Sequence, residues 1–286
     1  MKNFFLYFKK FISISRYNKP HGIFLLFYPC IWGLSISNKN ILEVYHLCII
    51  FFLGSCGMRA LGCIWNDLND KKFDIFVKRT KNRLVATGKV SNYEIIIFSI
   101  INFILGVLPL FYIGKLSIIL CFCVLPLIIS YPFMKRITYW PQLFLGLTFN
   151  WGIIMAWTSI TNEISYFPIL LYCGAIFWTL GYDTIYGLQD RSDDELIGVK
   201  STSIKFRNNL NLFLGICYSI SSFLIFLVII NLKIDYYFIF FLLFMFTLFY
   251  QIKIYNTKDP ASCLKAFKIN NISGLTVFLA IYFLTI

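Results

Sequence analysis

The stretch IWNDLNDKKFDIF, residues 64–76, places three aspartates, two asparagines and two lysines directly after a strongly apolar segment. The chain has 286 residues, of which 59% are hydrophobic and only 13 are acidic. Carboxylates near a bilayer interior cost free energy, so their gathering here indicates a site that requires negative charge. If the apolar segment continues as one helix, Asn66, Asp70 and Asp74 share a face and Asp67 lies beside it.

The composition around this stretch is that of an integral membrane protein. The mean hydropathy is +0.74, with 20% aromatic and 14% charged residues. Apolar runs of membrane-spanning length recur along the whole chain. They predict nine spans, at residues 22–37, 44–65, 93–113, 115–131, 141–160, 166–187, 209–231, 235–254 and 270–286. Because the turns near Gly114 and Asp235 are weak, eight spans remain an alternative. The expected fold is all-α, a bundle of about nine transmembrane helices that forms one membrane-embedded domain over residues 1–286.

The positive charges indicate how this bundle is oriented. With nine spans, 22 of the 26 Lys and Arg residues lie in the amino-terminal segment, in the loops that follow even-numbered spans, or at the span end next to such a loop. The loops and span ends on the opposite side hold 3. This asymmetry follows the positive-inside rule and predicts a cytoplasmic amino terminus and a cytoplasmic acidic stretch. Membrane orientation therefore explains the net charge of +13, and no nucleic-acid partner is expected. Residues 1–20 are basic and amphipathic and carry no small-residue cleavage site, which favours an uncleaved interfacial segment.

A second acidic group follows another even-numbered span, in GYDTIYGLQDRSDDE (181–195), and so faces the same side. On a continuous helix, Asp183, Tyr186, Asp190 and Asp194 share one face. Like charges stacked in this way repel, which indicates a cation between them. Mg²⁺ is the expected cation, because it takes oxygen ligands and is commonly held by one or two carboxylates together with substrate phosphates. A solvated acidic surface is the alternative for either group alone.

Arg59 lies within a span, seven residues before Asn66 and so on nearly the same face, about 10 Å deeper in the membrane. An arginine at that depth requires a partner. A diphosphate or a carboxylate bound in a polar cavity would supply one, and a salt bridge between packed helices is the alternative.

The segment ISYPFMKRITYWPQ, residues 129–142, ends the fourth span on the same side. Tyr131 and Lys135 are four residues apart, with Arg136 adjacent. By itself this is a basic loop with an interfacial tyrosine. Beside two acidic groups it resembles the cationic wall of an anion site, to which Lys200, Lys205 and Arg83 could add.

Together these residues resemble the UbiA-type membrane prenyltransferases. NDLNDKKFD (66–74), YPFMK (131–135) and DRSDD (190–194) are similar to the NDxxDxxxD, YxxxK and DxxxD elements of that family. The flanking sequence, over about residues 17–206, resembles the 4-hydroxybenzoate polyprenyltransferase branch, which acts in ubiquinone biosynthesis. LVATG (84–88) stands where the family usually has a proline-rich turn, which puts the conformation of that loop in question.

The resemblance implies a central cavity with cytoplasmic polar caps, and transfer of a polyprenyl group from polyprenyl diphosphate to the ring of 4-hydroxybenzoate. It implies Mg²⁺ ligands at Asn66, Asp67, Asp70, Asp74, Asp190 and Asp194. The catalytic residues expected are Asp70, Asp74, Asp190, Asp194, Lys135 and Arg136. Those expected to bind substrate are Arg59, Asn66, Tyr131, Lys135, Arg136, Asp183, Tyr186 and Lys200. Either Arg59 or Arg136 could instead bind the acceptor carboxylate, and Asp183 and Tyr186 could orient its phenol.

Other interpretations remain open. The acceptor could be homogentisate, dihydroxynaphthoate or haem. A cation-coupled transporter would also place charges in spans, but usually near the midplane rather than at one membrane face. The nine cysteines form no CxxC pair and are interpreted as small buried side chains. Membrane lipids are the expected surroundings, with a bacterial inner membrane favoured over a mitochondrial one.

Overall fold

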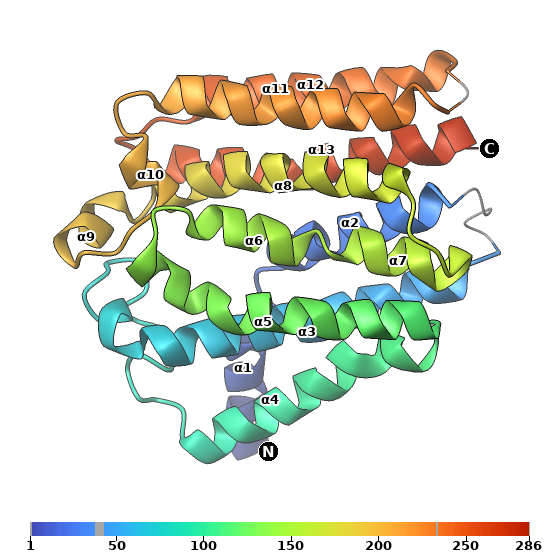
Figure 1. The fold of residues 1–286 in the computed structure, drawn as a ribbon. Helices are drawn as coiled ribbons and strands as arrows, with labels where there is room; N and C mark the ends of the chain where they lie inside the picture. Colours follow the sequence, from blue (N-terminus) through green and yellow to red (C-terminus); the bar gives the residue numbers. More distant parts are fainter. Residues whose placement is uncertain (1, 38–42, 233, 286) are drawn as a thin grey trace.

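The computed structural model describes residues 2–37, 43–232 and 234–285, and within them the chain is all-α. Its helices are α1 (Lys2–Ile14), α2 (His21–Ser35), α3 (Tyr45–Asp74), α4 (Asn92–Val107), η1 (Leu108–Phe111), α5 (Lys115–Ile137), α6 (Pro141–Phe149), α7 (Gly152–Thr161), α8 (Tyr166–Gly187), α9 (Arg191–Leu196), α10 (Thr202–Lys205), α11 (Leu210–Ile229), η2 (Tyr236–Phe238), α12 (Ile239–Ile254) and α13 (Pro260–Thr285). The long helices lie side by side as a bundle (Figure 1).

The predicted spans correspond to these helices. In the described part of the chain, seven helical segments are long and apolar enough to cross a membrane, and α4 with η1, α6 with α7, and η2 with α12 each form one segment. The helices α2, with 15 residues, and α8, with 22, occupy the two remaining predicted spans. The all-α polytopic fold is therefore confirmed. Three boundaries differ by more than two residues. The helices α3 and α5 continue nine and six residues beyond their predicted spans, and α13 begins at Pro260 instead of residue 270. Of the cations counted on the opposite face, Lys39 and Lys233 lie outside the described residues.

The outer surface of the bundle is apolar. Phe103, Phe122, Phe246 and Phe249 are each more than half exposed, as expected for side chains that face lipid tails. The interior holds large aromatic side chains, including the fully buried indoles of Trp32 and Trp178, whose ring centroids are 5.2 Å apart.

Buried amides connect the helices inside the bundle. Asn270 of α13 accepts a hydrogen bond from the indole of Trp178 at 2.7 Å and donates to Gln251 of α12 at 2.9 Å. Gln251 in turn accepts from the hydroxyl of Tyr218 in α11 at 2.8 Å. Such bonds add cohesion in a bilayer, where apolar contact alone gives helices little reason to associate.

The interruption between α6 and α7 is stabilised by Asn150. Its side-chain amide donates to the backbone oxygens of Gly146 and Ala175 and to the hydroxyl of Thr179, at 2.8, 3.1 and 2.8 Å. These bonds satisfy polar groups at the break and fasten it to α8.

The helix α1 runs across the direction of the other helices (Figure 1). One side packs Phe11 and Ile14 with Phe98 of α4, while Phe4 and Phe5 on the other side are 77% and 70% exposed. This two-sided surface is the pattern of a helix that lies in a membrane interface. The α3–α4 loop, α9 and α10 all lie at one end of the bundle.

Close packing of α3 on α4 generates a first prediction. A Cβ atom at Gly57 would lie 2.3 and 2.4 Å from the backbone atoms Gly106 N and Asn102 O, which cannot move aside. A Cβ at Gly215 of α11 would meet no atom within 4 Å. We expect Gly57→Ala to lower the free energy of unfolding by roughly 1–3 kcal/mol. Gly215→Ala should change it little. Thermal unfolding in detergent measures both, and equal melting temperatures for the two variants would contradict the packing.

Candidate active site

The first acidic group lies on the last turns of α3. Because α3 continues without a break to Asp74, the expectation that Asn66, Asp70 and Asp74 share a helix face is confirmed. Asp67, Asp70 and Asp74 are only 3%, 1% and 6% exposed. Charged groups so deeply buried must be paired, and each of them contacts a cation.

Those cations come from three other segments. Arg16, after α1, donates to Asp67 at 2.6 Å. Arg83, in the α3–α4 loop, donates to Asp67 at 3.0 Å and to Asp74 at 2.8 Å. At the end of α5, Lys135 donates to Asp70. The first acidic group is therefore the point at which distant segments converge.

The second acidic group does not form the single helical face that the spacing predicts. The helix α8 ends at Gly187, and Asp190 precedes α9, so Asp183 and Tyr186 lie on one helix and Asp194 on another. The physical reason is the packing of α10 against the end of α8. Ser203 donates to the backbone oxygen of Thr184 at 2.8 Å, and a Cβ at Gly187 would lie 2.6 Å from the Ser203 hydroxyl.

The α3–α4 loop joins the two acidic groups. The Arg79 guanidinium donates through Nε to both carboxylate oxygens of Asp190, at 2.8 and 3.0 Å, and through Nη1 to the Tyr186 hydroxyl at 2.9 Å. Next to it, the backbone N–H of Lys78 donates to Asp193 at 2.8 Å. The two motifs are 124 positions apart when counted from Asp70 to Asp194, yet they meet at one end of the bundle.

Lys135 and Asp194 also interact across this end. Burial and the neighbouring Asp190 carboxylate raise the pKa of Asp194 to about 7, while the charges of Lys135 and Arg79 act in the opposite direction. Lys135 therefore binds Asp70 of the first group and attracts Asp194 of the second. Arg136 donates to the backbone oxygen of Asn69 at 2.6 Å and stacks on Phe73 at 4.9 Å.

Deeper in the bundle, Arg59 lies 5.5 Å over the ring of Phe149. It forms no salt bridge within the described residues, although the Asp183 carboxylate is close enough to act on it. A Cβ at Gly62, one turn after Arg59 on the same face, would meet no atom within 4 Å. The space beside Gly62 is therefore not filled by the described chain, while the Arg59 guanidinium itself packs against Gly22 of α2.

Asp70 has the arrangement expected of a metal ligand. Its Oδ2 atom accepts from Lys135 and, at 2.7 Å, from Asn66. Its Oδ1 atom is buried with no hydrogen-bond partner in the described chain and is 3.7 Å from Arg136. Among the described residues, no three His, Cys, Asp or Glu side chains form a ready-made metal cage. Mg²⁺ often takes only one or two carboxylates and keeps waters and phosphates as its other ligands, so these residues fit that ion.

Lys200 lies apart from the carboxylates. Its ammonium donates to the backbone oxygen of Ile137 at 3.1 Å, and its backbone N–H donates to the backbone oxygen of Lys135 at 2.8 Å. Lys205 lies 4.5 Å from the ring of Trp140. In this arrangement Lys200 bonds to the end of α5, and its predicted role in binding substrate stays a prediction.

The contacts of Arg16 and the bridge formed by Arg79 were not anticipated from the sequence. Arg16 lies outside the region on which the resemblance was based, and Arg79 belongs to a basic run that is compatible with a solvated loop. Only the three-dimensional arrangement shows that both arginines bind buried or half-buried carboxylates.

Similarity to known proteins agrees with this geometry. The UbiA prenyltransferase family matches residues 26–272. A 4-hydroxybenzoate octaprenyltransferase of Marinomonas sp. (strain MWYL1) is 38% identical over 277 residues, which make up 96% of this chain and 96% of that protein. The chain belongs to the UbiA prenyltransferase family.

Solved structures of other UbiA homologues share the fold. One from Aeropyrum pernix K1, without ligand, has a TM-score of 0.76 at 19% identity, over 91% of this chain and 96% of that one. One from Archaeoglobus fulgidus, bound to GPP and Mg²⁺, has a TM-score of 0.69 at 18% identity, over 97% of this chain and 100% of that one.

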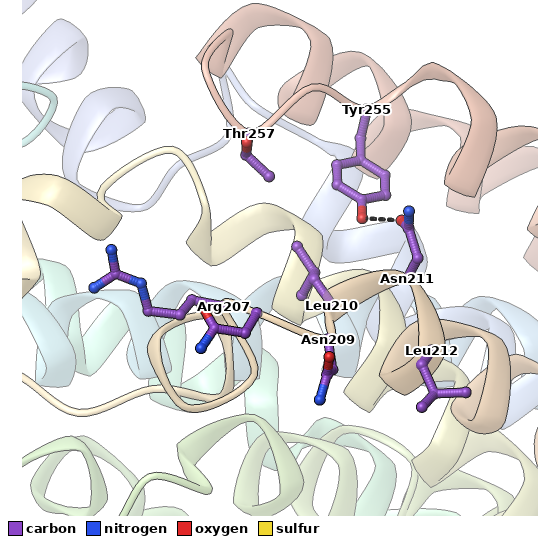
Figure 2. A pocket seen from close by; sticks show the side chains of 8 residues that line it. Arg207, Asn209, Leu210, Asn211, Leu212, Tyr255 and Thr257 are labelled. Carbon is purple, nitrogen blue, oxygen red and sulfur yellow. Dashed lines mark hydrogen bonds between the residues drawn. The ribbon is translucent and has the colours of Figure 1, made fainter.

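A separate pocket of about 390 Å³ lies where the loop before α11 meets the loop after α12 (Figure 2). Its polar lining includes Asn211, which accepts from the hydroxyl of Tyr255. None of the residues predicted for the UbiA-type site lines it.

The Arg79 bridge generates a second prediction. The Arg79 and Asp190 side chains are 33% and 13% exposed, whereas those of the Arg207–Glu195 pair are 59% and 34% exposed. We expect Arg79→Ala to lower the free energy of unfolding by roughly 1–3 kcal/mol, because it removes hydrogen bonds to a charged group. Arg207→Ala should cost less than about 1 kcal/mol, since solvent screens the exposed pair. Chemical unfolding in detergent compares the two variants, and a loss for Arg207→Ala as large as that for Arg79→Ala would refute the bridge.

Proposed function

We propose that this chain transfers a polyprenyl group from polyprenyl diphosphate to the ring of 4-hydroxybenzoate, with release of diphosphate, as a step of ubiquinone biosynthesis. The observation that carries the proposal is the meeting of two acidic groups and a cationic wall at one end of an apolar bundle. The name of the Marinomonas relative, which is similar over nearly the full length, supports this acceptor over homogentisate, dihydroxynaphthoate or haem.

The proposed metal is Mg²⁺. Asp70, Asp74, Asp190 and Asp194 would hold it, with Asn66 oriented by its bond to Asp70. Bound there, the ion would neutralise the diphosphate and stabilise the charge that develops on it during departure. The Mg²⁺ and GPP bound to the Archaeoglobus fulgidus homologue support this assignment.

The cations of the chain would bind the diphosphate directly. Each of these cations now binds a carboxylate of the two acidic groups: Lys135 binds Asp70, Arg79 binds Asp190, and Arg83 binds Asp74. An incoming anion can exchange with those carboxylates as the partner of each cation. As the bond from the terminal prenyl carbon to oxygen breaks, its electron pair leaves with the diphosphate. Preorganised positive charges that stabilise such a leaving group commonly account for much of catalysis.

The allylic cation that remains would form a carbon–carbon bond with the ring carbon next to the phenolic hydroxyl, and loss of the ring proton from that carbon restores aromaticity. Arg59 is our candidate for the acceptor carboxylate, because it lies one turn from the free space beside Gly62 and forms no salt bridge among the described residues. Asp183 and Tyr131, which lie near Arg59, are candidates for orienting the phenol, and Asp183 for accepting the proton.

The membrane setting follows from the donor. Each buried CH₂ of the prenyl tail favours an apolar environment by about 0.8 kcal/mol, so the tail stays in lipid while the diphosphate reaches the polar end. The charge asymmetry supports a cytoplasmic position for that end, and we propose a bacterial inner membrane as the host.

A third prediction concerns the metal. Purified protein with Mg²⁺, octaprenyl diphosphate and labelled 4-hydroxybenzoate should form a prenylated lipid product, detected by mass analysis, and EDTA should abolish it. Asp70→Asn should reduce kcat by at least about 100-fold, the scale of losing one electrostatic contact to a transition state. Glu163→Gln, at an exposed carboxylate outside the acidic groups, is the matched control and should leave the rate unchanged. A near-normal rate for Asp70→Asn would remove this residue from the metal site.

A fourth prediction concerns Lys135. Lys135→Ala should raise the KM for the diphosphate donor more than the KM for 4-hydroxybenzoate, because its ammonium binds Asp70, which lies 11 residues and about three helical turns from Arg59 on α3. We expect an increase of about tenfold for the donor, as for one lost charge-assisted hydrogen bond. Steady-state kinetics with each substrate varied in turn test this. Equal losses for both substrates would take Lys135 out of the diphosphate site.

A further inference from the structure

The linker between α1 and α2, residues 15–20, is fastened to α4 on both sides of Arg16. Ser15 accepts a hydrogen bond from the side-chain amide of Asn102 at 2.9 Å, and the hydroxyl of Tyr17 donates to the same amide at 2.6 Å. Asn102 is fully buried. Because a buried amide requires hydrogen-bond partners, these contacts hold the linker in one place.

Arg16 itself has a left-handed backbone with a φ of 59°, which is uncommon for a residue with a side chain. Its guanidinium donates to the backbone oxygen of Ser13 at 3.3 Å and to Asp67 Oδ2 at 2.6 Å. A backbone conformation of this kind persists where the surrounding contacts fix it, and here it directs the guanidinium into the first acidic group.

Asp67 differs from Asp70 in how its oxygens are used. Asp67 Oδ2 accepts from Arg16 and Asp67 Oδ1 accepts from Arg83 at 3.0 Å, so both oxygens bind arginines from two different segments. Asp70, in contrast, keeps a buried oxygen without a hydrogen-bond partner in the described chain. The two carboxylates lie on the same helix. Asp67 connects two arginines, whereas Asp70 has an oxygen available for a metal ion.

We propose that Asp67 is a positioning residue that holds Arg16 and Arg83 together, so that the amino-terminal linker sets the location of Arg83 in the active site. This interpretation replaces the expected role of Asp67 as a Mg²⁺ ligand and, in its kinetic consequences, rests on the proposed function. Arg16 precedes residues 26–272, the region that the family matches.

The surroundings of Lys19 support the arrangement. Burial, together with the charges of Arg16, Arg79 and Arg83, lowers the pKa of this lysine. The linker and the α3–α4 loop therefore face each other across a concentrated positive charge. Without carboxylates between them, these cations would repel one another. Asp67 is such a carboxylate, because it binds Arg16 of the linker and Arg83 of the α3–α4 loop.

Kinetics on the full-length protein in detergent, with octaprenyl diphosphate, 4-hydroxybenzoate and titrated Mg²⁺, test the proposal. Arg16→Ala and Asp67→Asn should each raise the donor KM by about tenfold, on the scale of one charge-assisted hydrogen bond. The Mg²⁺ concentration for half-maximal rate should not change. The double variant should be no worse than either single one, because the two residues act as a unit. Arg16→Lys should recover part of the loss.

Lys9→Ala is the matched control, since Lys9 is an exposed cation on α1 with no salt bridge among the described residues. It should leave both kinetic constants unchanged. The proposal is overturned if Asp67→Asn raises the Mg²⁺ requirement while Arg16→Ala changes nothing, which is the result expected of a metal ligand.

Hydrogen–deuterium exchange on the substrate-free protein separates this proposal from the proposed function. Asp67→Asn should speed backbone exchange in residues 15–19 and in residues 79–87, because both arginines lose their common partner, whereas Lys9→Ala should affect neither segment. If the wild-type protein forms no prenylated product but Asp67→Asn speeds exchange in both segments, the proposed function fails, while the role of Asp67 in holding Arg16 and Arg83 together is supported. If exchange in Asp67→Asn is unchanged, the positioning role of Asp67 is overturned, whatever product the enzyme makes.

Discussion

The arrangement of this end of the molecule depends on three carboxylates buried on one helix. Asp67, Asp70 and Asp74 are almost fully shielded from water, and burying an ionised carboxylate without a partner costs several kcal/mol. One helix cannot supply the counter-charges, because its own lysines, Lys71 and Lys72, point to the exposed side. Each carboxylate therefore recruits a cation from elsewhere in the chain.

That requirement orders segments that are distant in sequence. The linker after α1, the α3–α4 loop and the end of α5 all meet the end of α3 through ion pairs. The same loop extends to Asp190 through Arg79. Several segments therefore share in neutralising the buried carboxylates. A ligand that brings negative phosphates and a divalent cation can replace these ion pairs, because the phosphates pair with the arginines and lysine while the cation pairs with the carboxylates.

The part of this arrangement that the sequence predicted is the part governed by local rules. The spacing of Asn66, Asp70 and Asp74 predicted one helix face because α3 is a single continuous helix. The apolar runs located the membrane segments for the same reason. The spacing of Asp183 and Asp194 was misleading, since the contact of α10 with Gly187 ends α8 and depends on residues further along the chain.

The ion pairs between distant segments could not be predicted from the sequence either, because they too depend on the three-dimensional arrangement. Arg16, Arg79 and Lys200 are all cations near a membrane surface, and their sequence neighbourhoods do not distinguish them. Only Arg16 and Arg79 are directed at carboxylates, while Lys200 bonds to a backbone oxygen. Backbone geometry, such as the left-handed conformation at Arg16, determines which of these cations reaches a carboxylate. No periodicity in the sequence indicates that geometry.

The amphipathic helix α1 gives this geometry a physical basis. Its exposed Phe4 and Phe5 favour the apolar side of a membrane interface, and its other side packs on α4. A helix that packs on α4 and also lies in the interface would place the linker that follows it near the height of the membrane surface. A cation at that height can meet the end of α3, where the polar head of a lipid-soluble donor must also lie. The membrane surface is thereby a reference plane shared by the amino-terminal segment, the acidic groups and the donor diphosphate.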